Sequence, residues 1–211
     1  MCDLMATLKR GGEAASKRDY RAELIAERLT GKAESRYVSK EMRYGSELEP
    51  FARTAYEIKT ETIVDQMGFV FHPRLDFSGA SPDGLISEDG GVEIKCPKTT
   101  THLAYLATGT VPKEYENQML WNMACAEREW WDFVSFDPRL PEKLRLFIVR
   151  MPRDEARIAE MEREVMGLNH EIEIICEQLG VGANLAPMEA LTEREPFERD
   201  LNSAMVEVEY S

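Results

Sequence analysis

SPDGLISEDGGVEIKCP, residues 81–97, is the stretch that decides the fold of this chain. Two short apolar runs, GLI and VEI, lie on either side of the turn sequence Asp89-Gly90-Gly91. This arrangement predicts a β-hairpin, because turns with positive φ favour Asp-Gly or Gly-Gly. The segment therefore predicts paired strands near the middle of the chain.

The same hairpin carries three charged residues. Because side chains alternate along a strand, Glu93 and Lys95 share one face, while the residues between and around them point to the core. Pro82 fixes its own φ before Asp83, and Gly84 permits backbone conformations after it that other residues avoid, so the chain is expected to turn there. We therefore expect Asp83 to return close to Glu93 across the hairpin.

The chemistry of these three groups suits a divalent cation. Two carboxylates a few ångströms apart repel each other, and one takes up a proton unless a cation lies between them. Carboxylates suit Mg²⁺ or Mn²⁺, and such an ion activates water and stabilises charge on a phosphate in transfer. Lys95 could orient that water, help to deprotonate it, or neutralise the transition state. Alternatively, Glu-x-Lys is an ordinary solvated strand face, and the triplet alone leaves both interpretations open.

The hydrophobic periodicity on both sides of the hairpin predicts helices around a sheet. Pro50 is expected to kink the helix at 39–59 or to mark its late first turn, and Ser39 is the candidate N-cap of this helix. Gly31 and Gly180 are the candidate C-terminal ends of the helices at 18–30 and 153–179. Together these elements predict an α/β or α+β fold. Helices are expected at 18–30, 39–59, 99–127 with a break near 109–112, and 153–179, and strands are expected three times within 62–95 and then at 129–137 and 144–151.

Length and composition are typical of one globular domain. The chain has 211 residues, of which 43% are hydrophobic and 31% charged. No run of about 18 apolar residues occurs, so no membrane span is expected, and four cysteines without CxxC pairing are typical of reduced thiols in a cytoplasm. The acidic segment at 183–211 has few aromatic residues, and we expect it to be mobile or docked on a partner behind a single domain at 1–182.

The net charge of −13 is unusual for a protein that binds nucleic acid. Binding depends on the local field of one cleft, however, and the charges are unevenly distributed. The acidic residues concentrate after about residue 154. Basic residues gather at Lys9, Arg10, Lys17, Arg18 and Arg21 and again at Arg139, Lys143 and Arg145. This separation is compatible with DNA binding without indicating it.

The residues around the triplet resemble a known family. ASPDGLI at 80–86 followed by EIKCP at 93–97 is similar to the turn and strand motif of the phage lambda-type exonucleases, the YqaJ-like viral recombinases of the PD-(D/E)xK nuclease superfamily. The resemblance implies a restriction-endonuclease-like core with a central mixed β-sheet flanked by helices. It extends to YGSELEPFARTAYE at 44–57, EYENQMLWNM at 114–123 and FDPRLP at 136–141, and so covers most of residues 20–150.

The resemblance also implies catalytic and metal-binding roles. Asp83 and Glu93 would hold the metal together with the main-chain carbonyl of Ile94, and Lys95 would position the attacking water. Glu49 would add a carboxylate near a second metal position. The alternative for Glu49 is a surface glutamate on a helix.

Three further residues are expected near the DNA or its 5′ phosphate. Gln118 matches the glutamine of the family, and Tyr115 lies on the same helical face. Ser81 matches a residue that grips the 5′ phosphate, although a serine before proline can simply shape the turn. Core packing is an equal alternative for Tyr115, and Trp121, Trp130 and Trp131 are expected to be core or interface aromatics.

The implied activity is that of a Mg²⁺-dependent deoxyribonuclease, with Mn²⁺ as a substitute. It would digest linear duplex DNA from 5′ to 3′ and leave 3′ overhangs for phage recombination, as a homotrimeric ring with a single-strand annealing protein as partner, in the cytoplasm of a bacterial host. The family's N-terminal arginine element has no counterpart in MCDLMAT, residues 1–7, so the 5′-phosphate preference stays open, with Lys9, Arg10 or Arg18 as substitutes. The competing interpretations are a PD-(D/E)xK endonuclease and an inactive module that binds DNA ends.

Overall fold

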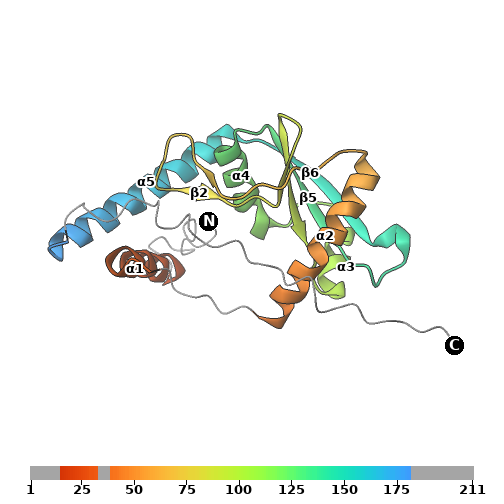
Figure 1. Ribbon diagram of the computed structural model, residues 1–211, viewed down its shortest axis with the longest axis horizontal. Helices are drawn as coiled ribbons and strands as arrows, with labels where there is room; N and C mark the ends of the chain where they lie inside the picture. Colours follow the sequence, from red (N-terminus) through yellow and green to blue (C-terminus); the bar gives the residue numbers. More distant parts are fainter. Residues whose placement is uncertain (1–14, 33–38, 182–211) are drawn as a thin grey trace, which may run out of the picture.

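The computed structural model describes residues 15–32 and 39–181 of the chain (Figure 1). The expected mixed sheet flanked by helices is confirmed. The acidic tail and the basic residues Lys9 and Arg10 lie outside the described residues. The helices are α1 (Ala15–Thr30), α2 (Lys40–Thr60), α3 (Thr99–Thr108), α4 (Lys113–Ala126) and α5 (Glu155–Gln178), and the strands are β1 (Val70–Phe71), β2 (Gly79–Ala80), β3 (Gly84–Ile86), β4 (Gly90–Lys95), β5 (Trp130–Phe136) and β6 (Leu146–Pro152).

The central sheet has four strands in the order β3-β4-β5-β6. The pairs β3–β4 and β5–β6 are antiparallel, while β4 and β5 run parallel, with Lys95 opposite Ser135. The parallel pair is joined by α3 and α4, as a parallel connection requires a crossover. Residues 62–95 contain four strands rather than the expected three, because β1 and β2 form a separate two-residue ladder of their own.

Helices cover both faces of this sheet (Figure 1). On one face, Trp131 and Phe133 of β5 pack in a buried cluster with residues of α4 and α5. On the other face, Val92, Ile94 and Val134 pack against Ala52 and Tyr56 of α2. Since alternate residues of β4 point in opposite directions, Glu93 faces the α4 side.

The hairpin between β3 and β4 forms, but its turn consists of residues 87–89, and Gly90 and Gly91, which the sequence pattern predicts to lie in the turn, already belong to β4. The positive φ of 52° belongs to Ser87, whereas Gly90 and Gly91 have no positive φ. Each of these glycines lies directly against an indole ring, Gly90 against Trp130 and Gly91 against Trp131, where a Cβ atom would collide with the ring. The two glycines are therefore required by the close packing of β4 on β5.

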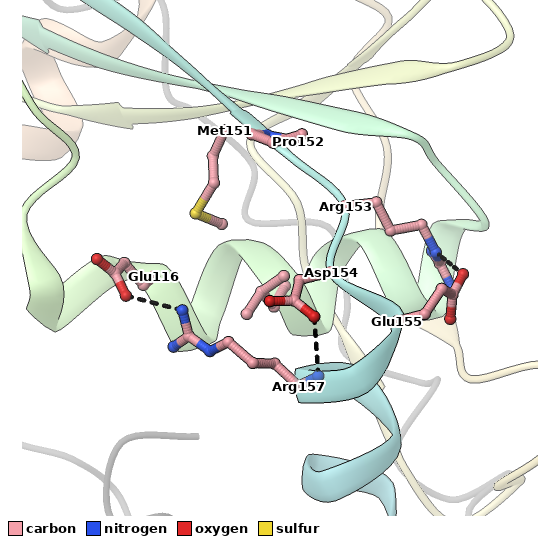
Figure 2. Close-up of a pocket in the computed structure, with 8 residues that line it drawn as sticks. Glu116, Met151, Pro152, Arg153, Asp154, Glu155 and Arg157 are labelled. Carbon is pink, nitrogen blue, oxygen red and sulfur yellow. Dashed lines mark hydrogen bonds and ion pairs between the residues drawn. The ribbon is translucent and has the colours of Figure 1, made fainter.

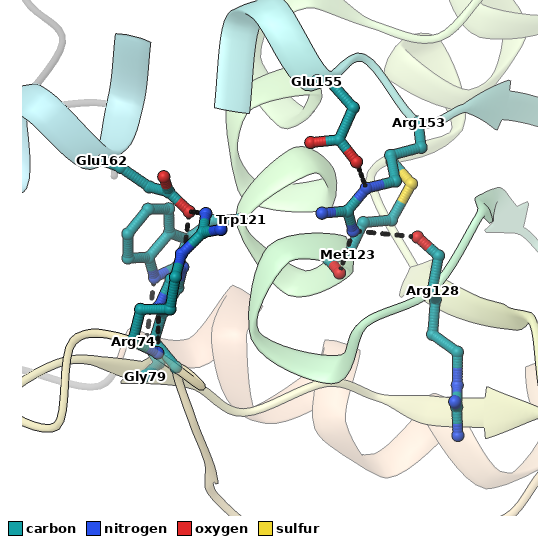
Figure 3. Close-up of polar contacts among 9 residues, drawn as sticks. Arg74, Gly79, Trp121, Met123, Arg128, Arg153, Glu155 and Glu162 are labelled. Atoms are coloured by element: carbon teal, nitrogen blue, oxygen red, sulfur yellow. Dashed lines mark hydrogen bonds and ion pairs between the residues drawn. The ribbon is translucent and has the colours of Figure 1, made fainter. Parts of the chain in front are cut away.

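Polar contacts hold α4 against the end of β6 and the start of α5 (Figure 2). Arg157 donates to Glu116 at 2.9 Å and to Asn117 at 2.8 Å. Arg153 donates through Nη1 to the carbonyl of Met123 at 2.6 Å, near the carboxyl end of α4 (Figure 3). These contacts surround an open hollow of about 490 Å³ on the side of α4 that carries Glu116.

The small β1–β2 ladder and α1 are both attached to neighbouring helices. Trp121 of α4 donates to the carbonyl of Gly79 at 3.2 Å, and Arg74 forms an ion pair with Glu162 of α5 (Figure 3). Lys17 and Arg21 of α1 each pair with an acid of α5, Glu164 and Glu171, at 2.7 Å. These two members of the N-terminal basic cluster therefore neutralise acidic residues of the same chain.

The structure also bears on the expected helix ends, the cysteines and the membrane spans. Gly31 and Gly180 follow α1 and α5 with positive φ angles of 66° and 78°, and Pro50 lies inside α2. Cys96, Cys125 and Cys176 are free thiols. Within residues 15–32 and 39–181, no helix combines the length and apolar character needed to cross a bilayer.

Candidate active site

Glu93 lies in the middle of β4, and its side chain is completely buried. Its Oε1 atom accepts hydrogen bonds from Lys95 Nζ and from Gln118 Nε2, the latter at 2.7 Å. Its Oε2 atom accepts from Asn122 Nδ2 at 3.2 Å. Gln118 and Asn122 are one turn apart on α4, so the helix presents two amide donors to one carboxylate.

Asp83 reaches the same strand from the turn that precedes β3. Its Oδ2 atom accepts a hydrogen bond of 2.7 Å from the main-chain N–H of Ile94. The next residue, Gly84, lies so close to Val64 that a Cβ atom at that position would collide with it. The Asp83 carboxylate thus lies beside the peptide unit that joins Glu93 to Ile94.

Lys95 completes the triplet at the end of β4. Its ammonium forms an ion pair with Glu93, and 27% of its side chain is exposed, so the group stands between the buried carboxylate and solvent. The same ammonium lies 5.2 Å from the ring centroid of Tyr115. Tyr115 also stacks on Phe133 at 5.3 Å, so this tyrosine both packs against the core and borders the site.

The electrostatics of the triplet show an excess of negative charge. Burial, followed by the charge of Asp83, raises the pKa of Glu93 to about 7. Burial also raises the pKa of Asp83, although Lys95 and the Ile94 amide act in the opposite direction. Burial lowers the pKa of Lys95, but the two carboxylates outweigh it and raise that pKa. One ammonium does not fully compensate two carboxylates at this depth.

Glu49 lies on α2, near enough to Asp83 and Lys95 for their charges to affect its pKa. Burial and then the charge of Asp83 raise the pKa of Glu49, while Arg53 and Lys95 lower it. Its Oε1 atom accepts from Arg53 Nη2 at 2.8 Å, one turn further along the helix. Glu49 therefore shares the electrostatic field of the site and already has a cationic partner.

The donor set fits a hard divalent cation that keeps part of its water shell. Within the part of the chain that the structure describes, no three His, Cys, Asp or Glu side chains converge into a closed metal cage. Mg²⁺ does not need one, since it is commonly held by one or two carboxylates together with waters and substrate phosphates. Asp83 and Glu93, with two raised pKa values, supply the charge that such an ion would neutralise.

The remaining sequence-based candidates occupy different positions. Ser81 is exposed beside the turn of Asp83, whereas Gln118 donates to Glu93. Asn122 was missed, although its distance of four residues from Gln118 places both on one face of α4. Trp121 and Trp131 are core residues, as expected. Trp130 packs against the apolar cluster between the sheet and α2, and its ring lies under the guanidinium of Arg150.

Comparisons with known proteins identify a family and a shared fold. Residues 6–129, more than half of the chain, match the family described as the YqaJ-like viral recombinase domain. A comparison with curated proteins finds no match. Among solved structures, the alkaline exonuclease LHK-Exo from Laribacter hongkongensis has 45% identity and a TM-score of 0.78 over 85% of this chain and 88% of the other.

Two further structures are similar. LHK-Exo in complex with dAMP has 44% identity and a TM-score of 0.76, over 85% of this chain and 90% of the other. A phage related exonuclease from Haemophilus somnus 129PT has 15% identity and a TM-score of 0.65, over 84% of this chain and 92% of the other. The last likeness concerns the fold alone.

Proposed function

The chain belongs to the YqaJ-like viral recombinase family, and on that premise we propose that it is a metal-dependent DNA exonuclease. The observation that carries this proposal is the convergence of Asp83, Glu93 and Lys95 on one strand and the turn beside it. The exonuclease activity named for LHK-Exo, at 45% identity, supports the same class of reaction.

The residues divide the work in the following way. Asp83 and Glu93, with the Ile94 carbonyl, would hold Mg²⁺ or Mn²⁺, and the bound ion would supply positive charge to the scissile phosphate. Lys95 orients the attacking water, because its ammonium is the group of the triplet that reaches toward solvent. Gln118 and Asn122 hold the Glu93 carboxylate in one orientation through their amide hydrogens.

The finer properties extend the same proposal. Digestion runs from 5′ to 3′ on linear duplex DNA and leaves 3′ overhangs for recombination. Ser81, Tyr115 and Gln118 lie near the 5′ end of the DNA strand that is digested, and Glu49 lies near a second metal position. The active form is a homotrimeric ring that acts with a phage single-strand annealing protein in the cytoplasm of a bacterial host. The family resemblance supports these properties.

Digestion of end-labelled duplex tests the activity and its direction. With Mg²⁺, linear DNA should be degraded from the 5′ label first, and closed circular DNA should stay intact. Cutting of the circle would instead indicate an endonuclease, and binding without turnover in Mg²⁺ or Mn²⁺ would indicate an inactive end-binding module. Release from the 3′ label first would reject the proposed direction.

Three variants test the site itself. Asp83→Asn, Glu93→Gln and Lys95→Ala should each lower the rate of digestion by more than about 100-fold, since each removes a group that acts directly on metal or water. Asp132→Asn is a matched control, because Asp132 is also a buried strand carboxylate but faces α2 and pairs with Tyr56. It should lose stability and keep its activity. A triplet variant with full activity would remove that residue from the site.

A further inference from the structure

The connection between β5 and β6, residues 137–145, lies beside the candidate active site. Because β4 and β5 are parallel and Lys95 pairs with Ser135, the segments that leave both strands emerge at the same edge of the sheet. Arg139 Nη2 lies 3.4 Å from the carbonyl oxygen of Pro97, which is two residues beyond Lys95. This arginine therefore stands next to the end of the strand that carries the triplet.

Arg139 is held in one place by Asp137. Asp137 Oδ1 accepts from Nε of Arg139 at 2.7 Å, and Oδ2 accepts from Nη2 at 3.0 Å. The same carboxylate accepts from the Arg139 main-chain N–H at 3.1 Å and from the Thr99 hydroxyl at 2.6 Å. Asp137 is 1% exposed, whereas 49% of the Arg139 side chain is exposed. The anchor is thus buried and the guanidinium is presented to solvent.

The guanidinium also borders the α2 side of the site. Its central carbon lies 5.7 Å from the ring centroid of Tyr44, which precedes Glu49 on the same helix. Among the residues that the structure describes, none accepts a hydrogen bond from Nη1 of Arg139. This leaves both Nη1 hydrogens available to an acceptor from outside the described part of the chain.

The exposed residues of this connection are mostly basic, in a chain with a net charge of −13. Lys143 and Arg145 are exposed together with Arg139, against one exposed acid, Glu142. Arg145 is anchored in a similar way, since its Nε donates to the carbonyl of Leu140 at 2.7 Å. With the buried Asp137 included, residues 137–145 carry three basic residues against two acids, a small positive balance that favours an anion such as phosphate.

We propose that Arg139 binds a phosphate of the DNA backbone close to the scissile bond, and that Asp137 is the positioning residue that holds its guanidinium. The inference rests on the proposed function, since it takes duplex DNA as the ligand. A planar guanidinium fixed through Nε and Nη2 presents its remaining N–H groups in a rigid geometry that matches phosphate oxygens. Neither residue takes part in the chemistry of the triplet.

Arg150 is a matched control within the same sheet. It is paired with a buried aspartate, Asp132, at 2.8 and 2.9 Å, and its guanidinium lies 3.4 Å from the ring centroid of Trp130. Its side chain is 54% exposed, close to the value for Arg139. Asp132 lies toward the beginning of β5 and faces α2, away from the end of the strand where the triplet lies. Arg150→Ala therefore removes a similar ion pair at a different place.

The test is fluorescence anisotropy of a labelled linear duplex in EDTA, which prevents digestion, at several salt concentrations. Arg139→Ala should weaken binding by about tenfold at low salt and make the slope of log K against log salt shallower by about 0.9, the value for one lost phosphate contact. Arg150→Ala should leave both quantities unchanged, although thermal unfolding should show a loss of stability for both variants. Equal binding and equal slopes for the two variants would overturn the proposal.

Two additional variants separate charge from position. Arg139→Lys should restore the salt slope but not the full affinity, because an ammonium is a single point charge. Asp137→Asn keeps the charge of Arg139 and releases its geometry, so the affinity should fall while the salt slope stays the same. A wild-type protein that neither binds nor digests the duplex would reject the proposed function, whereas wild-type digestion with an unchanged Arg139→Ala slope would reject only this inference.

Discussion

Replacement of Glu93 by glutamine is expected to stabilise the metal-free protein at alkaline pH, although this residue lies at the centre of the candidate site. Burial and the charge of Asp83 raise the pKa of Glu93 from an ordinary 4.5 to about 7. The folded protein therefore holds this proton over a pH range in which the unfolded chain has lost it. Ionisation of Glu93 opposes folding, with no cost below pH 4.5, an increasing cost up to about pH 7 and a constant cost above.

The size of the effect follows from the pKa. At about 1.4 kcal/mol per pKa unit, a rise from 4.5 to about 7 corresponds to roughly 3 kcal/mol. Burial raises the pKa of Glu93, whereas the attraction of Lys95 and the hydrogen bonds from Lys95 and Asn122 lower it, so the value of about 7 already includes their effect. We therefore expect Glu93→Gln to be more stable than the wild type by up to about 3 kcal/mol at high pH.

Urea unfolding in EDTA at pH 5 and at pH 8.5 measures this difference. At pH 5 the wild type and Glu93→Gln should unfold at similar urea concentrations, and at pH 8.5 the variant should require more urea. Addition of Mg²⁺ at about 100 times its Kd should stabilise the wild type by about 2.7 kcal/mol and the variant by less, since the variant lacks a charged ligand. A variant that is less stable by the same amount at both pH values would refute the reasoning.

Two other predictions concern packing and acid stability. Gly91→Ala should lower the free energy of unfolding by about 1 to 3 kcal/mol, because the new Cβ would meet the buried indole of Trp131, whereas Gly68→Ala, with no atom within 4 Å, should have little effect in the same urea assay. Burial raises the pKa of Asp137, but hydrogen bonds from Arg139 and Thr99 outweigh burial and lower this pKa to about 2. The ionised Asp137 therefore contributes about 2 kcal/mol to the free energy of unfolding above pH 4, and this contribution is lost as the pH falls toward 2. The difference in stability between wild type and Asp137→Asn should therefore shrink between pH 5 and pH 2, and a constant difference would contradict the assigned pKa.

Local patterns predicted most of the secondary structure. The helices at α1 and α5 end before Gly31 and Gly180, and the break between α3 and α4 lies where glycine and proline interrupt the periodicity. The hairpin at β3–β4 was predicted, but its turn lies at residues 87–89 rather than at Asp89-Gly90-Gly91. The sequence pattern predicted a turn with positive φ at Gly90 and Gly91, whereas these positions must be glycine because they touch the indoles of Trp130 and Trp131. Those indoles follow forty residues later in the chain, so no local pattern shows the contact.

The site shows the same division. The alternation of β4 was enough to place Glu93 and Lys95 on one face, and the family resemblance drew attention to Gln118. The spacing of Asn122 from Gln118 places both amides on one face of α4, but only the fold shows that this face meets a buried carboxylate. The N-terminal basic residues were considered in relation to DNA, whereas Lys17 and Arg21 pair with α5 across more than a hundred residues of sequence.

Short-range sequence patterns are enough to predict most helices and strands, the turn at Asp83 and the polar face of β4, since these depend on neighbours within a few residues. The packing of distant segments sets how deeply Glu93 is buried, which helix supplies its amide donors and where the Arg139 guanidinium lies. The physical reason is that burial and electrostatic coupling depend on distances between atoms, and the parallel crossover from β4 to β5 brings together groups far apart in the chain. Local periodicity does not contain those distances.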